Sequence, residues 1–157
     1  MTPFEQERIE TSRVALVPLA PAQRRSVLDG DLTGLVHADG WPHADTLDAL
    51  RPDWPVWLVV ADGLVVGECG TVGGVMTDGE VEIGLGLAAE RRGRGLGTEV
   101  IAALAAWLAR SPAVRRIVAR VDVGNVASRR AFEKAGFVLE RSDERACLYV
   151  REPRQTT

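Results

Sequence analysis

Residues 91–97, RRGRGLG, stand directly before the most helix-like apolar segment of the chain, TEVIAALAAWLAR at residues 98–110. Three arginines and three glycines share these seven positions. In the following segment apolar residues recur at helical spacing, and Pro112 ends the pattern. The sequence therefore predicts a flexible, positively charged loop at the N-terminus of an amphipathic helix.

This loop is a candidate anion site. The first turn of a helix leaves backbone N–H groups without partners and carries partial positive charge. Glycines just before the helix let the backbone curl, so that several N–H groups point at one anion. The arginines add groups that can bind phosphate oxygens in pairs. A solvated turn would also use glycine, but the strand, the loop and the helix together favour a phosphate site.

The segments before the loop predict three consecutive antiparallel strands. Valine-rich runs at residues 56–61 and 64–72 flank the turn ADG and predict a hairpin. Residues 79–87, GEVEIGLGL, predict the third strand, with branched residues on one face and Glu82 with two glycines on the other. These glycines indicate a bulge, a place where a ligand approaches the backbone closely, or both.

The remaining patterns complete a single domain. Further strands are predicted at residues 13–19, 114–123, 137–141 and 146–152, and further helices at residues 20–31, 44–51 and 125–134. Asn125 can cap the last of these helices, and Gly136 can stop it. The prediction is one α+β domain spanning residues 1–157, with its core at about 11–151. Its sheet is mixed and mostly antiparallel, with six to seven strands flanked by helices.

Composition excludes several classes of function. The formal net charge of -3 disfavours nucleic-acid binding, which needs a basic surface. No apolar run approaches the roughly 20 residues that span a bilayer, and the first ten residues lack the pattern of a secretory signal. Cys69 and Cys147 have no CxxC spacing, so we expect reduced thiols and a cytoplasmic protein. No cluster of histidine, cysteine and carboxylate residues suggests a metal.

Two nucleotide-binding motifs can be set aside. The phosphate loop GxxxxGK[ST] needs a lysine directly after a glycine, and the chain has none. Residues 84–89, GLGLAA, match the loose dinucleotide fingerprint. They lie within a strand pattern, however, and not at a turn from strand to helix, so this match carries no weight.

Arg92, Gly95 and Gly97 form the pattern R-x-x-G-x-G, which resembles the acetyl-CoA pyrophosphate signature of the GNAT acetyltransferase superfamily, Q/R-x-x-G-x-G/A. VEIGLGL at residues 81–87 is similar to that family's fourth strand, and NVASRRAFEKAGF at residues 125–137 to its later cofactor-contacting segment. The combined pattern is most similar to the branch that includes ribosomal-protein N-terminal acetyltransferases. The resemblance implies the acyl-CoA N-acyltransferase fold, in which the two central strands splay into a V.

The same resemblance implies acetyl-CoA as co-substrate, with no metal. The pantetheine arm would lie beside the strand at Leu85 and Leu87. The pyrophosphate would rest on the loop and the first helical turn: Arg92, Gly93, Arg94, Gly95, Leu96, Gly97 and Thr98. Asn125 matches an asparagine that contacts the pantetheine arm, although it also suits a helix cap. Ser128 aligns with a serine placed near the thiol.

Acetyl transfer to an amine needs a base, because free amines have pKa values of roughly 8 for an α-amine and roughly 10.4 for lysine. The resemblance puts Glu82 first, since its position in VEIG resembles a catalytic glutamate of histone-acetylating members. Glu68, on the neighbouring predicted strand, is the second candidate. Either residue could instead be an exposed strand carboxylate.

Two positions depart from the family pattern. Many relatives have a tyrosine seven residues after the asparagine, where this chain has Phe132. Phenylalanine cannot donate a proton, so Ser128, Tyr149 or bound water must replace the tyrosine, or the thiolate leaves unassisted. Arg120 stands where some N-terminal acetyltransferases have a glutamate, which weakens assignment to one ribosomal substrate.

Trp41 and His43 are candidate acceptor-pocket residues, because they lie in the irregular segment that covers the acceptor site in relatives. Trp57, within a predicted strand, is expected in the core. The predicted function is direct transfer of acetyl from acetyl-CoA to a primary amine of a small molecule or peptide, in a ternary complex. The alternative is a catalytically silent acyl-CoA-binding sensor. A longer acyl group and a homodimer, common in this branch, also stay open.

Overall fold

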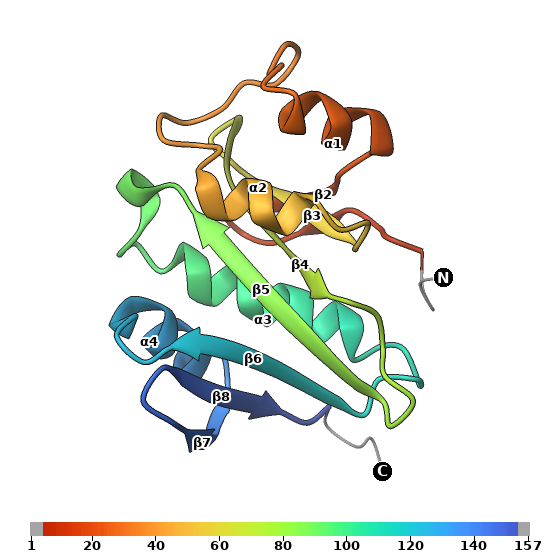
Figure 1. Ribbon diagram of the computed structural model, residues 1–157, viewed down its shortest axis with the longest axis vertical. Helices are drawn as coiled ribbons and strands as arrows, with labels where there is room; N and C mark the ends of the chain where they lie inside the picture. Colours follow the sequence, from red (N-terminus) through yellow and green to blue (C-terminus); the bar gives the residue numbers. More distant parts are fainter. Residues whose placement is uncertain (1–4, 154–157) are drawn as a thin grey trace.

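A computed structural model describes residues 5–153, so the ends of the predicted domain 1–157 lie outside the described residues. The strands form one sheet in the order β1-β2-β3-β4-β5-β6-β8-β7 (Figure 1). Their bounds are β1 Ile9–Glu10, β2 Ala15–Pro18, β3 Val56–Ala61, β4 Leu64–Val72, β5 Glu80–Leu87, β6 Arg116–Asp122, β7 Val138–Ser142 and β8 Ala146–Arg151. The helices are α1 Pro21–Leu28, α2 Ala44–Leu50, α3 Leu96–Leu108 and α4 Val126–Lys134, with the 3-10 turn η1 at Ala89–Arg91.

The predicted fold class is confirmed, with one correction to the number of strands. The sheet is antiparallel except for the parallel pair β5 and β6. Within residues 5–153 it has eight strands where six to seven were predicted, because the short strand β1 pairs with β2 through Ile9–Leu16 and Glu10–Ala15. Two paired residues are too few to produce a recognisable alternation in the sequence.

The hairpin β3–β4 has the predicted bounds, because its turn chemistry is local. Asp62 and Gly63 connect the strands with positive φ angles of 54° and 75°. Two such residues form the tight turn whose twist matches that of the flanking strands. Aspartate and glycine are the residue types that tolerate this backbone conformation.

The sheet opens between β5 and β6. The two strands pair from Glu80–Arg116 to Glu82–Val118. Beyond this point β5 continues against β4 as far as Leu87, and β6 continues against β8 as far as Asp122. Figure 1 shows the two strands starting together and separating toward their C-terminal ends, with α3 behind β5 and α4 beside the end of β6. The V that the resemblance implied is therefore present.

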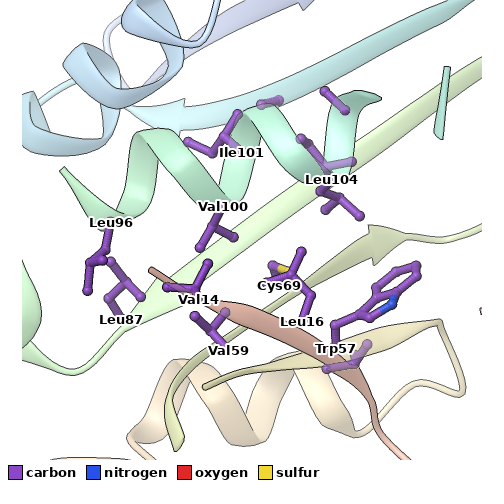
Figure 2. Packing of buried hydrophobic residues seen from close by; sticks show 14 of the residues in the cluster. Val14, Leu16, Trp57, Val59, Cys69, Leu87, Leu96, Val100, Ile101 and Leu104 are labelled. Atoms are coloured by element: carbon purple, nitrogen blue, oxygen red, sulfur yellow. The ribbon is translucent and has the colours of Figure 1, made fainter. Parts of the chain in front are cut away.

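The core fixes α3 against the sheet. One stripe of α3 is buried and consists of Leu96, Val100, Ile101, Leu104, Ala105 and Leu108. Figure 2 shows Leu96 and Leu87 of β5 next to one another at the N-terminal end of this stripe. Trp57 is fully buried and meets Trp107 edge to face at a centroid distance of 5.3 Å, so its predicted core role is confirmed. Apolar burial of this extent anchors the helix whose first turn borders the V.

Two features are absent from the described residues. None of the helices within residues 5–153 is long and apolar enough to span a bilayer. In the same part of the chain, no three histidine, cysteine or carboxylate side chains are grouped so that they could hold a metal ion. Cys69 and Cys147 are free, buried thiols.

Candidate active site

The V between β5 and β6 leads into a cleft of about 540 Å³ that runs between α2, the end of β5, the N-terminal part of α3, and α4. Most of the predicted cofactor residues lie on its wall: Leu85, Leu87, Arg92, Gly93, Gly95, Gly97, Thr98, Asn125 and Ser128. These residues come from three separate segments of the chain, at residues 85–87, 92–98 and 125–128. The structure therefore brings the three matching motifs together at one cavity.

The glycine loop has the geometry of an anion cradle. Gly93 and Gly95 have φ angles of 77° and 79°, in the left-handed region that favours glycine. Gly95 is the N-cap residue of α3, and the first helical hydrogen bond runs from Glu99 N–H to Gly95 O at 3.3 Å. The N–H groups of residues 96–98 precede that bond, so they are left for a ligand.

Three residues predicted to contact the pyrophosphate, Arg92, Leu96 and Arg94, have different environments. Arg92 lies on the cleft wall, and its Nε donates to Leu87 O at 3.1 Å, which folds the loop back on the end of β5. The side chain of Leu96 is 6% exposed and packs in the core, so this residue can offer only its N–H. Arg94 is exposed and lies outside the cleft wall.

Helix α4 adds two cations to the cleft wall. Arg130 and Lys134 line the same cleft as Arg92. Arg129 points elsewhere: its Nε donates to Tyr149 Oη at 3.2 Å and its Nη1 to Val123 O at 3.1 Å. The spacing of four residues puts positions 130 and 134 on one face of α4. Only the position of the helix in the fold shows that this face borders the cleft. The cleft thus has a cationic end suited to phosphates.

Asn125 is the N-cap residue of α4, as the sequence predicted. Its Oδ1 accepts a hydrogen bond from Ser128 N–H at 3.1 Å. Both residues also line the cleft. The cap occupies the side-chain oxygen of Asn125 and leaves Nδ2 as the donor that can face a ligand.

Glu68 is the buried carboxylate of the cleft. It lies on the cleft wall and is 4% exposed. Its Oε1 accepts hydrogen bonds from Trp41 Nε1, at 3.1 Å, and from Thr46 Oγ1. Burial raises the pKa of Glu68 to about 7, against the lowering effect of these two hydrogen bonds. A carboxyl group with this pKa exchanges protons readily near neutral pH, which suits a general base.

Gly86 makes room for that carboxylate. Glu68 and Gly86 are register partners on β4 and β5, and a Cβ on Gly86 would lie 2.0 Å from Glu68 Oε2. The register of β4 and β5 is continuous from Gly67–Leu87 to Val72–Glu82, so the bulge considered for this strand is wrong. The close approach at Gly86 is made by Glu68.

Glu82 has a different environment. It lies where β5 and β6 still pair, it is outside the cleft wall, and its Oε1 is 3.7 Å from Arg120 Nε. Burial raises the pKa of Glu82, and Arg120 opposes this shift. Arg120, which departs from the family pattern, thus serves as the ion-pair partner of Glu82. The geometry therefore favours Glu68 over Glu82 as the candidate base.

The two predicted pocket residues have distinct positions. Trp41 is 2% exposed and is not part of the cleft wall; its indole N–H donates to Glu68 Oε1 instead. His43 does line the cleft, and its Nδ1 accepts from Thr46 N–H at 3.3 Å as the cap of α2. Its Nε2 is buried and has no hydrogen-bond partner among residues 5–153. Trp54, which is exposed, also lines the cleft.

Among the candidate acids, Ser128 lies on the cleft wall and Tyr149 does not. The Tyr149 hydroxyl donates to Glu133 Oε2 at 2.7 Å and accepts from Arg129, and the residue is fully buried. This environment disfavours Tyr149 as the proton donor. Phe132 is also buried, packed edge to face on Phe137 and stacked on Tyr149. Its aromatic ring contributes to packing beneath α4.

Comparison with known proteins agrees with this geometry. The model of the acetyltransferase (GNAT) domain family matches residues 13–138, so the chain belongs to the GNAT acetyltransferase family. It is similar to the uncharacterized N-acetyltransferase YjdG of Bacillus subtilis (strain 168), with 25% identity over 146 residues, which cover 84% of this chain and 86% of that protein.

Solved structures share the fold. RimL, a ribosomal L7/L12 alpha-N-protein acetyltransferase in complex with coenzyme A, has a TM-score of 0.68 and 19% identity, covering 93% of this chain and 98% of that one. A GNAT-family acetyltransferase from Bacillus anthracis has a TM-score of 0.70 and 15% identity, with coverages of 94% and 99%. The aminoglycoside acetyltransferase AAC(6')-Ib, also with coenzyme A, has a TM-score of 0.64 and 19% identity, with coverages of 88% and 94%.

Proposed function

We propose that this GNAT-family acetyltransferase moves the acetyl group of acetyl-CoA to a primary amine, with Glu68 as the general base. The observation that carries the proposal is the position of Glu68: a buried carboxylate on the wall of the cleft that also contains the glycine loop. A cleft with a phosphate cradle and a carboxylate of raised pKa combines the two functions that the reaction needs.

The residues present fit acetyl-CoA. The N–H groups at the start of α3 suit the pyrophosphate, and Arg92, Arg130 and Lys134 supply positive charge around it. Leu85 and Leu87 offer the edge of β5 that β6 leaves unpaired past Glu82. When bound, acetyl-CoA supplies an activated acyl group as a thioester.

Glu68 accepts the proton of the attacking amine. Oε1 is held by Trp41 and Thr46, so Oε2, beside Gly86, is the oxygen left to take a proton. The C–N bond forms as the C–S bond breaks, and the departing sulfur takes a proton from Ser128 or from water. Ser128 fits this role because it lies on the cleft wall at the start of α4.

The acceptor is an amine at the α2 end of the cleft, where His43, Asp45 and Trp54 line the wall. RimL acts on a ribosomal protein and AAC(6')-Ib on aminoglycosides by their names. Both a peptide N-terminus and a small amine therefore belong in a substrate panel. A cytoplasmic site of action, supported by two free thiols, and a homodimer stay predictions.

The decisive experiment measures acetyl-CoA-dependent thiol release with a panel of amines for the wild type, Glu68→Gln and Glu82→Gln. We expect turnover with at least one amine, a loss of roughly a hundredfold or more in kcat in Glu68→Gln with CoA binding intact, and a small effect in Glu82→Gln. A large loss of kcat in Glu82→Gln, with no comparable loss in Glu68→Gln, would identify Glu82 as the base. CoA binding without turnover for any amine would favour the catalytically silent sensor.

A further inference from the structure

The turn between β1 and β2 is attached to the first turn of α3. Thr11 closes this turn, since its N–H donates to Val14 O at 2.9 Å and its Oγ1 accepts from Val14 N–H at 3.1 Å. The carboxylate of Glu99, in the first turn of α3, then receives hydrogen bonds from Thr11 Oγ1, Arg13 N–H and Arg13 Nε. The two contacts from Arg13 each measure 2.9 Å.

Arg13 also reaches the glycine loop itself. Its Nη1 donates to Arg94 O at 2.8 Å, and its Nη2 lies 3.3 Å from the place of a Cβ on Gly95. The carbonyl of Arg94 and the N–H of Gly95 belong to one planar peptide group and point in opposite directions. Holding that carbonyl therefore also fixes the direction of the Gly95 N–H, at a residue of the cleft wall.

The same contacts neutralise a negative charge beside the phosphate cradle. Glu99 follows directly after the N–H groups of residues 96–98, and its side chain is only 18% exposed. Burial would raise its pKa, but the hydrogen bonds from Thr11 and Arg13 outweigh burial and lower it, so the carboxylate is ionised at neutral pH. An unpaired carboxylate at this place would repel a phosphate group.

We propose that Arg13 is a positioning residue for the cofactor site, which holds the glycine loop in its anion-binding shape and masks the charge of Glu99. This inference rests on the proposed function, because the anion it serves is the diphosphate of CoA. Arg13 lies outside the cleft wall, and it acts through Arg94, Gly95 and Glu99.

The test measures CoA binding by calorimetry for Arg13→Gln, Glu99→Gln and the double variant. Arg13→Gln should raise the Kd for CoA about tenfold, because it releases the loop and leaves the charge of Glu99 unpaired. Glu99→Gln should change the Kd less. The double variant should bind CoA more tightly than Arg13→Gln, since the repulsive charge is gone. Arg8→Gln is the control, because Arg8 forms an exposed ion pair with Glu10.

Two further readouts separate positioning from general stability. With the amine acceptor at saturation, Arg13→Gln should raise KM for acetyl-CoA and leave kcat near that of the wild type. Without any ligand, amide hydrogen exchange at residues 93–98 should be faster in Arg13→Gln than in Arg8→Gln. Thr11→Val removes one hydrogen-bond donor to Glu99. It should raise KM for acetyl-CoA and speed amide exchange at residues 93–98, each less than Arg13→Gln does.

The outcomes are distinguishable. Unchanged CoA affinity and unchanged loop exchange in Arg13→Gln would overturn the role of Arg13. A double variant that binds CoA no better than Arg13→Gln would overturn the masking of Glu99. Failure of the wild type to bind CoA would overturn the proposed function and with it the cofactor part of this inference, while the exchange experiment would still decide whether Arg13 holds the loop.

Discussion

The carboxylate of Glu68 fills the space that a side chain at Gly86 would occupy, since a Cβ at position 86 would lie 2.0 Å from Glu68 Oε2. The two residues face each other on β4 and β5, and Trp41 and Thr46 hold the other carboxylate oxygen. A glycine within a strand costs stability, so this position indicates a functional requirement. The requirement is a fixed place for a buried carboxylate.

Gly86→Ala should therefore impair catalysis more than cofactor binding. The new methyl group displaces the carboxylate from its place, and a displacement of about 1 Å can cost on the order of a hundredfold in rate. We expect kcat to fall about 10- to 100-fold in steady-state assays at saturating acetyl-CoA. Gly84→Ala is the matched control, because a Cβ there meets Val72 Cγ2 at 3.9 Å, an ordinary contact. Equal losses in the two variants would contradict this explanation.

The pH dependence of kcat/KM should reflect the ionisation of the Glu68 carboxyl group. Burial raises its pKa to about 7, and a base must be deprotonated to act, so kcat/KM should rise with pH through about 7. This rise in the pH profile has its midpoint at a lower pH than the rise caused by deprotonation of the amine, whose pKa is roughly 8 or higher. We call the rise near pH 7 the acidic limb of the profile. Glu82→Gln should keep the limb near pH 7 and Glu68→Gln should lose it. A limb that persists in Glu68→Gln would assign the ionisation to another group.

The free energy of unfolding should also depend on the ionisation of Glu68, but it should fall over the pH range in which kcat/KM rises. The pKa of Glu68 is raised on folding from 4.5 to about 7, so the folded chain binds more protons than the unfolded chain between these values. Its contribution is fully present below pH 4.5 and is lost as pH rises through about 7, by on the order of 3 kcal/mol. Urea unfolding across this range should show a steeper decline for the wild type than for Glu68→Gln.

Trp41→Phe should shift the limb near pH 7 to higher pH. The indole N–H of Trp41 donates to Glu68 Oε1 at 3.1 Å, and this hydrogen bond lowers the pKa of Glu68 against burial. Phenylalanine keeps an aromatic ring but has no donor, so a smaller fraction of Glu68 is ionised at pH 7 and the rate there should fall severalfold. Trp57→Phe also removes an indole hydrogen bond, to Glu7 O, and should leave the profile in place.

Local chemistry explains which elements the sequence predicted correctly. The turn at Asp62 and Gly63 and the cap at Asn125 depend on residues within four positions of each other, so the sequence indicates both directly. The glycine loop is likewise contiguous. The cofactor half of the site was therefore predictable, apart from Arg130 and Lys134, whose direction depends on where α4 lies.

The catalytic half depends on contacts between distant segments. Glu68 and Glu82 are both glutamates on strands, but in the folded chain Glu68 is buried beside Trp41 and Thr46, whereas Glu82 lies beside Arg120 and outside the cleft wall. Trp41 is 27 positions from Glu68, and Arg13 is 86 positions from Glu99. No period of helix or strand relates residues so far apart, so these partners emerge only from the folded chain.

Gly93→Ala should separate the anion-binding role of the loop from its backbone conformation. Gly93, on the cleft wall, and Gly73, outside it, have nearly equal φ angles of 77° and 78°, and neither would meet another atom within 4 Å if it carried a Cβ. Both alanine variants should lose about 1 kcal/mol of stability, the ordinary cost of left-handed backbone for a residue with a Cβ.

Only Gly93→Ala should also weaken CoA binding, by about tenfold, because relief of its strain turns the loop N–H groups away from the anion. Calorimetry with CoA, alongside thermal unfolding of both variants, measures the two effects separately. Equal CoA affinity in Gly93→Ala and Gly73→Ala would mean that the cradle does not depend on the left-handed conformation at position 93. The anion would then be held by Arg92, Arg130 and Lys134, and log Kd should respond steeply to salt.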